Sequence, residues 1–424
     1  MDSNELILDS EIDRASELGG SSLEQESLWR KLHNHAYLTF MSIGIGLLWP
    51  WNCILSASVY FKHDVFHDTT VWANIFTSSM MTVSTLSSML FNIWLSRRQH
   101  SYSQRVTRGL FWEIVVFFAL GVVTLMHKLV PLWLTFTFVL TLVAISSVAT
   151  AMTQNGAMAI ANVYGSEYSQ AVMVGQAIAG VLPSIVLLVI SIFSDPTKQS
   201  VGGILMYFLT TAIVATISVL LYRVNKIDAR LNNTKSTALV THTIPFSTLF
   251  RKLKYLVLSI FTTFVVTLIF PVFAANIPVK GLPLSNSQFS PFIFTVWNLG
   301  DLHGRVLADW PIFRNPRFTP FKTFIYSLSR LLFVPMFFYF SMNTSSTTSL
   351  AILQDLGYTL LQYGFGVTNG HVISISFMKV PEQLANDEER EAAGGFTNIF
   401  VSTGLTVGSI VSYLFVFAIG SFKK

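Results

Sequence analysis

Residues 131–163, PLWLTFTFVLTLVAISSVATAMTQNGAMAIANV, decide the fold class, because 33 consecutive residues contain no charged side chain. A helix needs about 20 apolar residues to cross roughly 30 Å of hydrocarbon, so this stretch can span a bilayer with some tilt. The sequence predicts an all-α polytopic membrane protein with about eleven transmembrane helices. The other ten segments are 35–61, 71–95, 109–127, 169–194, 200–222, 253–277, 286–309, 318–341, 348–378 and 394–420.

The composition of the whole chain indicates the same class. Of the 424 residues, 52% are hydrophobic and 12% are charged, whereas about 25% of residues are charged in an average soluble protein. So few charges cannot cover the surface of a soluble enzyme. The single cysteine, Cys53, excludes an internal disulfide. The sequence lacks a P-loop, a dinucleotide fingerprint, a metal-spaced Cys/His cluster and a nucleophile elbow, so we expect no cofactor, metal or enzymatic activity.

The basic residues predict the orientation in the membrane. With the N-terminus in the cytosol, 19 of the 27 Lys and Arg residues fall on the cytosolic side and six on the opposite side. The remaining two, Arg305 and Arg330, lie within spans. This asymmetry follows the positive-inside rule, and an odd number of spans places the C-terminus outside the cytosol. We expect a vacuolar or lysosomal-type membrane or the plasma membrane, and no nucleic-acid partner.

The predicted domain organisation has four parts. Residues 1–34 read as an acidic, disordered cytosolic tail without the features of a signal peptide. Residues 35–222 form six helices, 223–252 form a polar, basic cytosolic loop, and 253–424 form five helices. This 6+5 arrangement resembles the major facilitator fold and is typical of a transporter with two rocking bundles. Asn343 begins a glycosylation sequon on the far side, and its occupancy is left open.

The eighth predicted span, SPFIFTVWNLGDLHGRVLADW (290–310), contains the most informative polar residues. Asp301 and Arg305 are four residues apart, so they share a helix face and can pair, and Asn298 lies on the same face. Because charges are costly inside the bilayer, they predict either an ion pair that locks two helices or a substrate or gating site. His303, between them in sequence, is either a packing histidine or a group for proton coupling.

Two other spans contain unusual residues. In the first span, Trp49 and Trp51 flank Pro50 too deep for the membrane interface. Each tryptophan is either a flat stacking surface for a planar ligand or a core residue beside a proline kink. In the fourth span, Gln154 and Asn155 offer amide donors and acceptors, which either bind a polar ligand or link helices.

Taken together, several segments resemble the equilibrative nucleoside transporter family. Leu48-Trp49-Pro50-Trp51-Asn52 resembles its L-x-P-W-N signature, and Phe270-Pro271 resembles its F-P step in the seventh span. Residues 297–305 resemble its N-x-x-D-x-x-G-R pattern, and residues 330–335 and 365–370 add weaker matches. The resemblance covers nearly the whole chain after the acidic tail. It implies eleven helices in a fold similar to the major facilitator group, and facilitative transport of nucleosides, often with nucleobases, by alternating access.

The resemblance also implies which residues contact a nucleobase. By matching position, Leu48 and Trp51 would line the cavity against the base, and Gln154 would hydrogen-bond to it. Leu55 matches a position that faces the cavity in relatives. These roles suit a planar ligand, which needs a stacking wall and an amide at its edge.

The sugar would contact the eighth span. The resemblance implies that Asp301 and Arg305 hold the ribose hydroxyls and that Asn298 supports this pair. A carboxylate can accept two hydroxyl donors, and a neighbouring guanidinium keeps it ionised. His303 stands where the family usually has an apolar or aromatic residue, so the substrate range can differ.

Three other functions remain open. The first is a proton-coupled nucleoside or nucleobase carrier, with Asp301, His303 or Glu113 as the proton-binding group. The second is a facilitator-type carrier of another small polar solute, and the third is a receptor or scaffold without flux. In all of them we expect a monomer in the lipid bilayer. Glu113, Asp309 and Asp355 lie near predicted span ends, where contact with solvent is the simplest expectation.

Overall fold

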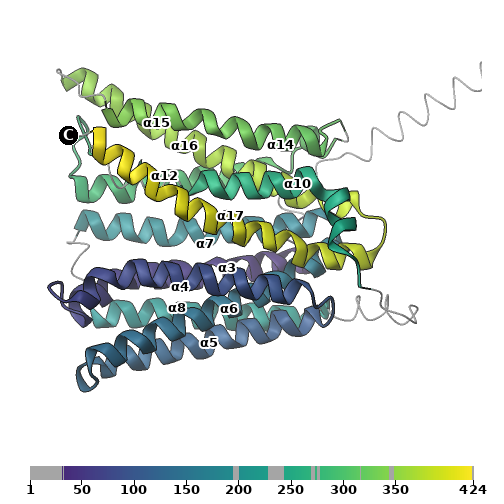
Figure 1. The fold of residues 1–424 in the computed structure, drawn as a ribbon, viewed down its shortest axis with the longest axis horizontal. Helices are drawn as coiled ribbons and strands as arrows, with labels where there is room; N and C mark the ends of the chain where they lie inside the picture. Colours follow the sequence, from purple (N-terminus) through teal and green to yellow (C-terminus); the bar gives the residue numbers. More distant parts are fainter. Residues whose placement is uncertain are drawn as a thin grey trace, which may run out of the picture.

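The computed structural model describes residues 31, 33–193, 200–227, 243–268, 273–274, 277–315, 317–342 and 348–422. These residues are helical wherever they form regular structure, and they contain no strand. Long helices lie side by side along one direction (Figure 1). The described part of the chain contains eleven long helical segments, six before residue 228 and five after residue 242, so the predicted all-α 6+5 fold is confirmed.

The first six helices are α3 (His35–Tyr60), α4 (Val71–Ser96), α5 (Tyr102–Met126), α6 (Leu132–Tyr164), α7 (Ser166–Phe193) and α8 (Val201–Val224). The last five segments are α10 (Phe246–Thr267), α12 (Asn286–Leu307), α14 (Pro320–Ser329) with α15 (Phe333–Met342), α16 (Thr348–Lys379) and α17 (Asp387–Phe422). The short elements are η2 (Phe61–Val65), η3 (His127–Leu129), α13 (Pro311–Arg314), η4 (Arg330–Leu332) and η5 (Pro381–Gln383).

Hydropathy supports insertion into a membrane. Among the described residues, seven helices are long and apolar enough to cross a bilayer: His35–Val65, Tyr102–Leu129, Leu132–Tyr164, Ser166–Phe193, Val201–Val224, Pro320–Ser341 and Asp387–Ser412. The other four long helices, α4, α10, α12 and α16, contain more polar residues. The protein is therefore an integral membrane protein, and its less apolar helices need neighbours to cover their polar faces.

Several helices extend further than hydropathy predicts. α5, α10 and α17 begin at Tyr102, Phe246 and Asp387, in each case seven residues before the predicted span. Charged side chains in these first turns lower the local hydropathy, so the predicted span begins only after them. The helix itself includes them. Long basic side chains can leave the bilayer while the backbone remains helical. The ninth span also differs from a single helix, because the 3-10 turn η4 joins α14 to α15.

Some predicted features lie outside the described residues. These are the acidic tail up to residue 30, most of the central loop (228–242), the Phe270-Pro271 step and the Asn343 sequon. The sequence expectations for these segments therefore stay predictions.

Glycines permit the closest helix crossings. A Cβ atom added to Gly44 or Gly175 would overlap a backbone carbonyl oxygen across the α3–α7 contact. At the α12–α16 contact, a Cβ on Gly304 would overlap the carbonyl oxygen of Val367, and one on Gly370 would overlap that of Asp301. Small residues let membrane helices approach until their backbones touch. The α12 backbone around Asp301 is thereby fixed against α16.

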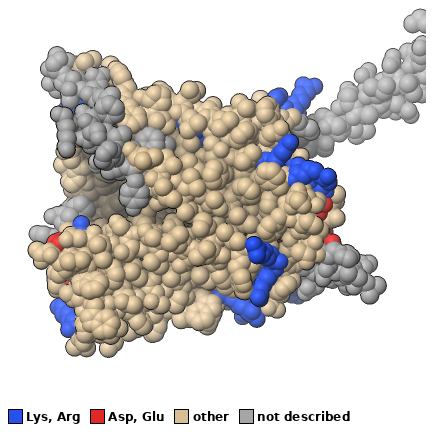
Figure 2. Space-filling model, viewed as in Figure 1, with Lys and Arg blue, Asp and Glu red and all other residues tan. Residues whose placement is uncertain are grey.

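Several contacts between the first six and the last five helices lie at the end that contains most basic residues. Lys31 forms an ion pair with Asp309, and Asn162 Nδ2 donates to the carbonyl oxygen of Arg390 at 3.2 Å. Gln99 exchanges two hydrogen bonds with the backbone of Ile244, at 2.9 and 2.7 Å. Basic side chains cluster at this end, on the right in Figure 2, and the surface is hollowed between the two halves at the other end.

Candidate functional site

The candidate site centres on an ion pair inside α12. Arg305 Nε donates to Asp301 Oδ2 at 2.9 Å, and the two residues are only 7% and 3% exposed. The spacing of four residues places both side chains on one helix face. The ion pair that the sequence predicts is therefore confirmed. Burial makes the pair interdependent, because either charge alone would be left without a counterion in a low-dielectric environment.

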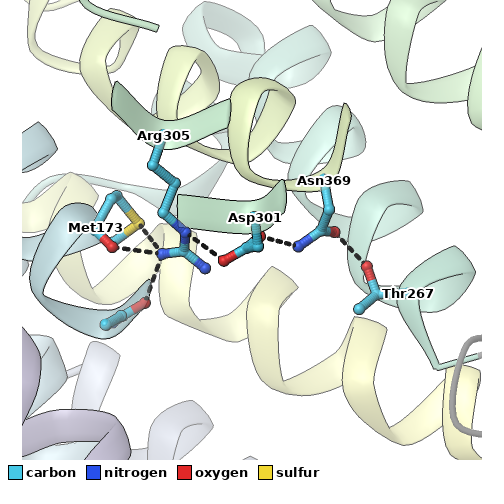
Figure 3. A network of polar contacts seen from close by, with 6 residues as sticks. Met173, Thr267, Asp301, Arg305 and Asn369 are labelled. Carbon is cyan, nitrogen blue, oxygen red and sulfur yellow. Dashed lines mark hydrogen bonds and ion pairs between the residues drawn. The ribbon is translucent and has the colours of Figure 1, made fainter. Parts of the chain in front are cut away.

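A chain of hydrogen bonds continues from Asp301 through the last five helices (Figure 3). Asn369 Nδ2 of α16 donates to Asp301 Oδ1 at 2.6 Å, and Thr267 Oγ1 of α10 donates to Asn369 Oδ1. Arg330 Nη1 donates to the carbonyl oxygen of Thr263 at 3.0 Å and to Thr267 Oγ1 at 3.4 Å. Both oxygens of the Asp301 carboxylate therefore have one protein donor each.

Arg305 also connects this chain to the first six helices. Its Nη1 donates to the carbonyl oxygen of Met173 at 2.7 Å and to Gln176 Oε1 at 3.4 Å, both on α7 (Figure 3). In return, Gln170 Nε2 of α7 donates to the carbonyl oxygen of Arg305 at 3.2 Å. The network therefore crosses between the two halves of the molecule at Arg305.

Arg330 adds a second buried cation. Its side chain is completely buried, and its guanidinium lies 4.6 Å from the centre of the Phe365 ring. Arg330 Nε and Nη2 have no hydrogen-bond partner among the described residues. The network thus contains two guanidinium groups and one carboxylate, so Asp301 is the anion on which both cations depend.

The predicted base-contacting residues lie on α3 and α6. Leu48, Trp51 and Leu55 share one face of α3 and are partly exposed, with Leu55 at 39%, whereas the opposite face of this helix is buried. Asn52 Nδ2 ties α3 to α7 by donating to the carbonyl oxygen of Ala179 at 2.8 Å. Gln154 is partly buried on α6 and has no hydrogen-bond partner among the described residues.

Two predicted residues of α12, Asn298 and His303, have no hydrogen bond to the Asp301 network among the described residues. Asn298 Nδ2 donates to the carbonyl oxygen of Phe294 in its own helix at 2.8 Å, and its side-chain oxygen lies against Gly180 of α7. The contact to Asp301 comes from Asn369 instead. His303 lies on the exposed face of α12, where its Nδ1 is hydrogen-bonded to the Tyr363 hydroxyl at 2.5 Å. It is not a packing histidine of the interior.

The expected solvent contact of the three acidic residues is largely wrong. Glu113 lies near the middle of α5 and is 1% exposed; Ser146 and Thr150 of α6 each donate to one of its oxygens at 2.8 Å. Asp355 is also buried. Its carboxylate accepts hydrogen bonds from the three backbone amides of residues 280–282. Asp309 is partly exposed and pairs with Lys31 and Arg314. Partners on other segments replace water at Glu113 and Asp355.

Sequence reasoning recognised only part of this network. Asn369 attracts notice as an amide in an apolar span, but nothing local identifies Asp301 as its partner. Arg330 is visible as an intramembrane charge without an assigned role. Met173 and Gln170 give no sequence signal, because the first contributes a backbone carbonyl and the second is an ordinary helix residue. Among the described residues, no group of three His, Cys, Asp or Glu side chains is placed to bind a metal ion.

Comparison with known proteins identifies the family. A family model described as "Nucleoside transporter" matches residues 139–243 and 228–417. The chain is 54% identical to nucleoside transporter FUN26 of Saccharomyces cerevisiae, over 96% of this chain and 89% of that protein. It is 25% identical to equilibrative nucleoside transporter 3 of Rattus norvegicus, over 90% of this chain and 88% of that protein.

The comparison of structures concerns the fold. The proton:xylose symporter XylE of the major facilitator superfamily, solved with 6-bromo-6-deoxy-D-glucose, aligns with a TM-score of 0.60 at 15% identity, covering 91% of this chain and 88% of that chain. The chain therefore has a fold like that of this major facilitator protein. With more than half of its residues matched by the family model and a relative at 54% identity, the chain belongs to the nucleoside transporter family.

Proposed function

We propose that this protein transports nucleosides, and nucleobases as a second substrate class, down their concentration gradient by alternating access. The observation that carries the proposal is the buried Asp301–Arg305 pair, which is linked to α16 on one side and to α7 on the other. Intramembrane charges mark substrate pathways, and this pair lies where the two halves meet. The names of the relatives support nucleosides as the substrate class.

The carboxylate of Asp301 retains capacity for a sugar. Each oxygen carries two acceptor positions, and the protein occupies one on each: Arg305 at Oδ2 and Asn369 at Oδ1. Asp301 is only 3% exposed in this conformation, so two ribose hydroxyls would use these remaining positions, without displacing either partner, once the bundles move and the site opens to the substrate. Trp51 supplies a flat wall for the base and Gln154 an amide for its edge, whereas Leu48 and Leu55 line the same α3 face.

Alternating access requires the two bundles, residues 35–222 and 253–424, to rock about this site. We infer that the basic end faces the cytosol, as the positive-inside rule predicts. Opening that end must separate Lys31 from Asp309 and Asn162 from the Arg390 carbonyl. Closing the opposite end must bury the substrate at Asp301. A monomer in a vacuolar, lysosomal-type or plasma membrane fits this mechanism, because each chain contains both bundles.

Flux of radiolabelled adenosine and uridine into proteoliposomes tests the function, with and without an imposed pH gradient. We expect saturable flux that equilibrates but does not concentrate either nucleoside, and no saturable flux into protein-free vesicles. Transport of another solute without competition from nucleosides would indicate a different facilitator-type carrier. A complete absence of flux would leave a receptor or scaffold.

Gln154→Ala should mainly weaken substrate binding. The variant loses one hydrogen bond to the base, worth about 1 kcal/mol, so we expect the KM for uridine to rise about fivefold with little change in the maximal rate. Gln383→Ala, which truncates an exposed glutamine in η5, serves as the control. An unchanged KM in Gln154→Ala would remove the base contact from the proposal.

Asn369→Ala should weaken recognition of the ribose. The variant deprives Asp301 Oδ1 of its protein donor and removes the link to Thr267, whose hydroxyl keeps the Thr263 carbonyl oxygen as acceptor, and so disconnects Arg330 from the carboxylate. Hydrogen bonds to charged groups contribute about 1.5–3 kcal/mol, so we expect the KM for adenosine to rise tenfold or more. Adenosine uptake, measured over a series of adenosine concentrations, gives this KM.

A second substrate separates the positioning of Asp301 by Asn369 from a general structural effect of the substitution. A 2′,3′-dideoxynucleoside has no ribose diol, so Asn369→Ala should change its KM much less than that of adenosine. Thr368→Ala removes a hydroxyl that bonds within α16 and is the matched control. Equal losses for both substrates would contradict the positioning role of Asn369.

Proton-coupled transport is the second candidate, and one observation favours it. Glu113 is buried in the bilayer region, yet it has two hydroxyl donors and no basic partner among the described residues. A buried carboxyl without a cation is a group that can bind a proton during a transport cycle. His303, the sequence candidate, lies instead on the exposed face of α12.

Glu113→Gln distinguishes the two candidates. The amide retains the shape of the side chain and an acceptor for Ser146 or Thr150, but it cannot titrate. For a facilitative carrier, we expect equilibrative flux within about twofold of the wild type and no accumulation in either protein when a pH gradient is imposed. Accumulation by the wild type that disappears in Glu113→Gln would instead establish proton coupling through this residue.

A further inference from the structure

A cavity of about 260 Å³ lies on the first half of the molecule, away from the Asp301 network. It is lined by residues of α4, of α5, of the turn that joins them and of α6, against which both helices pack, at the basic end. The lining residues on which the argument depends are Phe91, Trp94, Arg98, Arg105, Arg108 and Met152.

The cavity is strongly basic. Three arginines line it, and no carboxylate does so among the described residues. Arg98 and Arg108 are exposed, and the described part of the chain gives neither of them an acidic partner. Arg105 is buried, and it donates only to neutral acceptors, the carbonyl oxygen of Arg98 and Asn155 Oδ1. Three positive charges therefore meet in one cavity without a carboxylate lining it in the described part of the chain.

An apolar ridge leads away from this cavity along the outside of α4. Leu86, Leu90 and Trp94 are spaced four residues apart, so they lie on one face of the helix, and each is at least 43% exposed. The Arg98 guanidinium lies 4.1 Å from the centre of the Trp94 ring. Trp94 therefore lies between the basic cavity and an apolar surface. Tryptophan is enriched at such a boundary, the interface between membrane and water.

We propose that this cavity binds the head group of an anionic phospholipid. The phosphate would be held by Arg98 and Arg108, with Arg105 behind them, and an acyl chain would lie along Leu86 and Leu90. Guanidinium groups match the geometry of phosphate oxygens, and basic pockets between transmembrane helices at the cytosolic face bind anionic head groups. A soluble phosphate would satisfy the arginines but leave the apolar ridge unused, so the lipid is the better fit.

Native mass spectrometry of the full-length protein, released from nanodiscs that contain phosphatidylinositol and phosphatidylcholine, measures the bound lipid. We expect retention of phosphatidylinositol over phosphatidylcholine. Each Lys or Arg near a membrane surface contributes about 1 kcal/mol toward an anionic lipid. Arg98→Gln should therefore weaken binding about fivefold, and Arg98→Gln/Arg108→Gln about 30-fold. Trp94→Leu tests the same site without changing its charge and should also lose affinity.

Control variants separate this site from general attraction to a basic surface. Arg97→Gln and Arg223→Gln remove the same charge from exposed residues at the same end that do not line the cavity. They should leave affinity within twofold. All variants should retain wild-type nucleoside flux, which shows that they are folded.

Several results would overturn the proposal. One is equal retention of both lipids by the wild type, and another is an equal loss in the control variants. Displacement of phosphatidylinositol by millimolar inorganic phosphate would assign the cavity to a soluble anion instead.

Discussion

Asp301→Ala is expected to reduce nucleoside flux at least about 100-fold while the protein still inserts into the membrane. The substitution leaves Arg305 buried without its counterion and Asn369 without its acceptor. Removing one partner of a buried ion pair costs about 3–5 kcal/mol, and this corresponds to a factor of 100 or more in an equilibrium constant. The loss affects transport directly because the same carboxylate is proposed to accept the ribose hydroxyls.

Uptake of adenosine, normalised to the amount of inserted protein, measures this effect. Asp387→Ala is the matched control, since Asp387 pairs with Arg390 at a partly exposed position where such pairs contribute little. Normal flux through a correctly inserted Asp301→Ala protein would exclude Asp301 from the mechanism. Residual uptake of a 2′,3′-dideoxynucleoside should equal that of adenosine in Asp301→Ala, because neither can then use the diol contact.

Arg305→Lys should also lose most of the flux, although it conserves charge. Arg305 uses Nε to bind Asp301 and Nη1 to bind the carbonyl oxygen of Met173 across the two halves. A lysine ammonium is a single point of charge and lacks this fork, so it cannot occupy both positions with the same geometry. Wild-type uptake by Arg305→Lys would argue against Arg305 as the bridge between the halves.

The Asp301–Arg305 pair could be predicted from sequence because it is local, four residues apart on one helix. Its other partners could not. Asn369 lies 68 positions from Asp301 and Met173 lies 132 positions from Arg305, and no periodicity indicates which faces of α16 and α7 meet α12. The contact depends on tertiary packing, which hydropathy does not encode. Asn298 shows the same limit: it lies on the predicted face, yet its side chain bonds within α12 and faces α7.

The number of helices could be predicted because it does not depend on tertiary packing. An apolar run of sufficient length is a property of the segment itself. Acidic residues near the apparent ends of spans were misleading. Glu113 is covered by α6, the next helix, from which Ser146 and Thr150 donate hydrogen bonds to its carboxylate. Asp355 likewise depends on backbone amides about 75 positions away. Partners of this kind convert an expected solvent contact into a buried one.

Gly370→Ala is expected to cause the second large effect, on stability and on ribose recognition together. A methyl group at this position would overlap the carbonyl oxygen of Asp301 and lie 3.0 Å from Arg305 Cγ. Neither atom can move freely, because one belongs to the α12 backbone and the other to the buried ion pair. Overpacking in a close contact costs about 1–3 kcal/mol, and more where backbone must shift, so we expect about 3 kcal/mol of lost stability.

Thermal unfolding in detergent measures the first effect, and Gly121→Ala is its control. Gly121 is a helical glycine of α5 where an added Cβ meets only Leu205 Cδ2 at 3.6 Å, an ordinary contact. Gly121→Ala should leave the melting temperature nearly unchanged. A melting temperature in Gly370→Ala equal to that of Gly121→Ala would show that α12 and α16 do not need to touch.

Gly366→Ala separates stability from recognition. Gly366 is one turn from Gly370 on the same face of α16. Its added Cβ would overlap the carbonyl oxygen of Trp297 and lie 3.0 Å from the backbone nitrogen of Asp301, whereas the overlap at Gly370 is with the carbonyl oxygen of Asp301. Both variants should therefore lose stability. Gly370 neighbours Asn369, so pushing α16 away at this point moves the Asn369 amide from Asp301 Oδ1, and the KM for adenosine should rise more in Gly370→Ala than in Gly366→Ala. Equal KM values would mean that the helix contact maintains the fold without positioning the site.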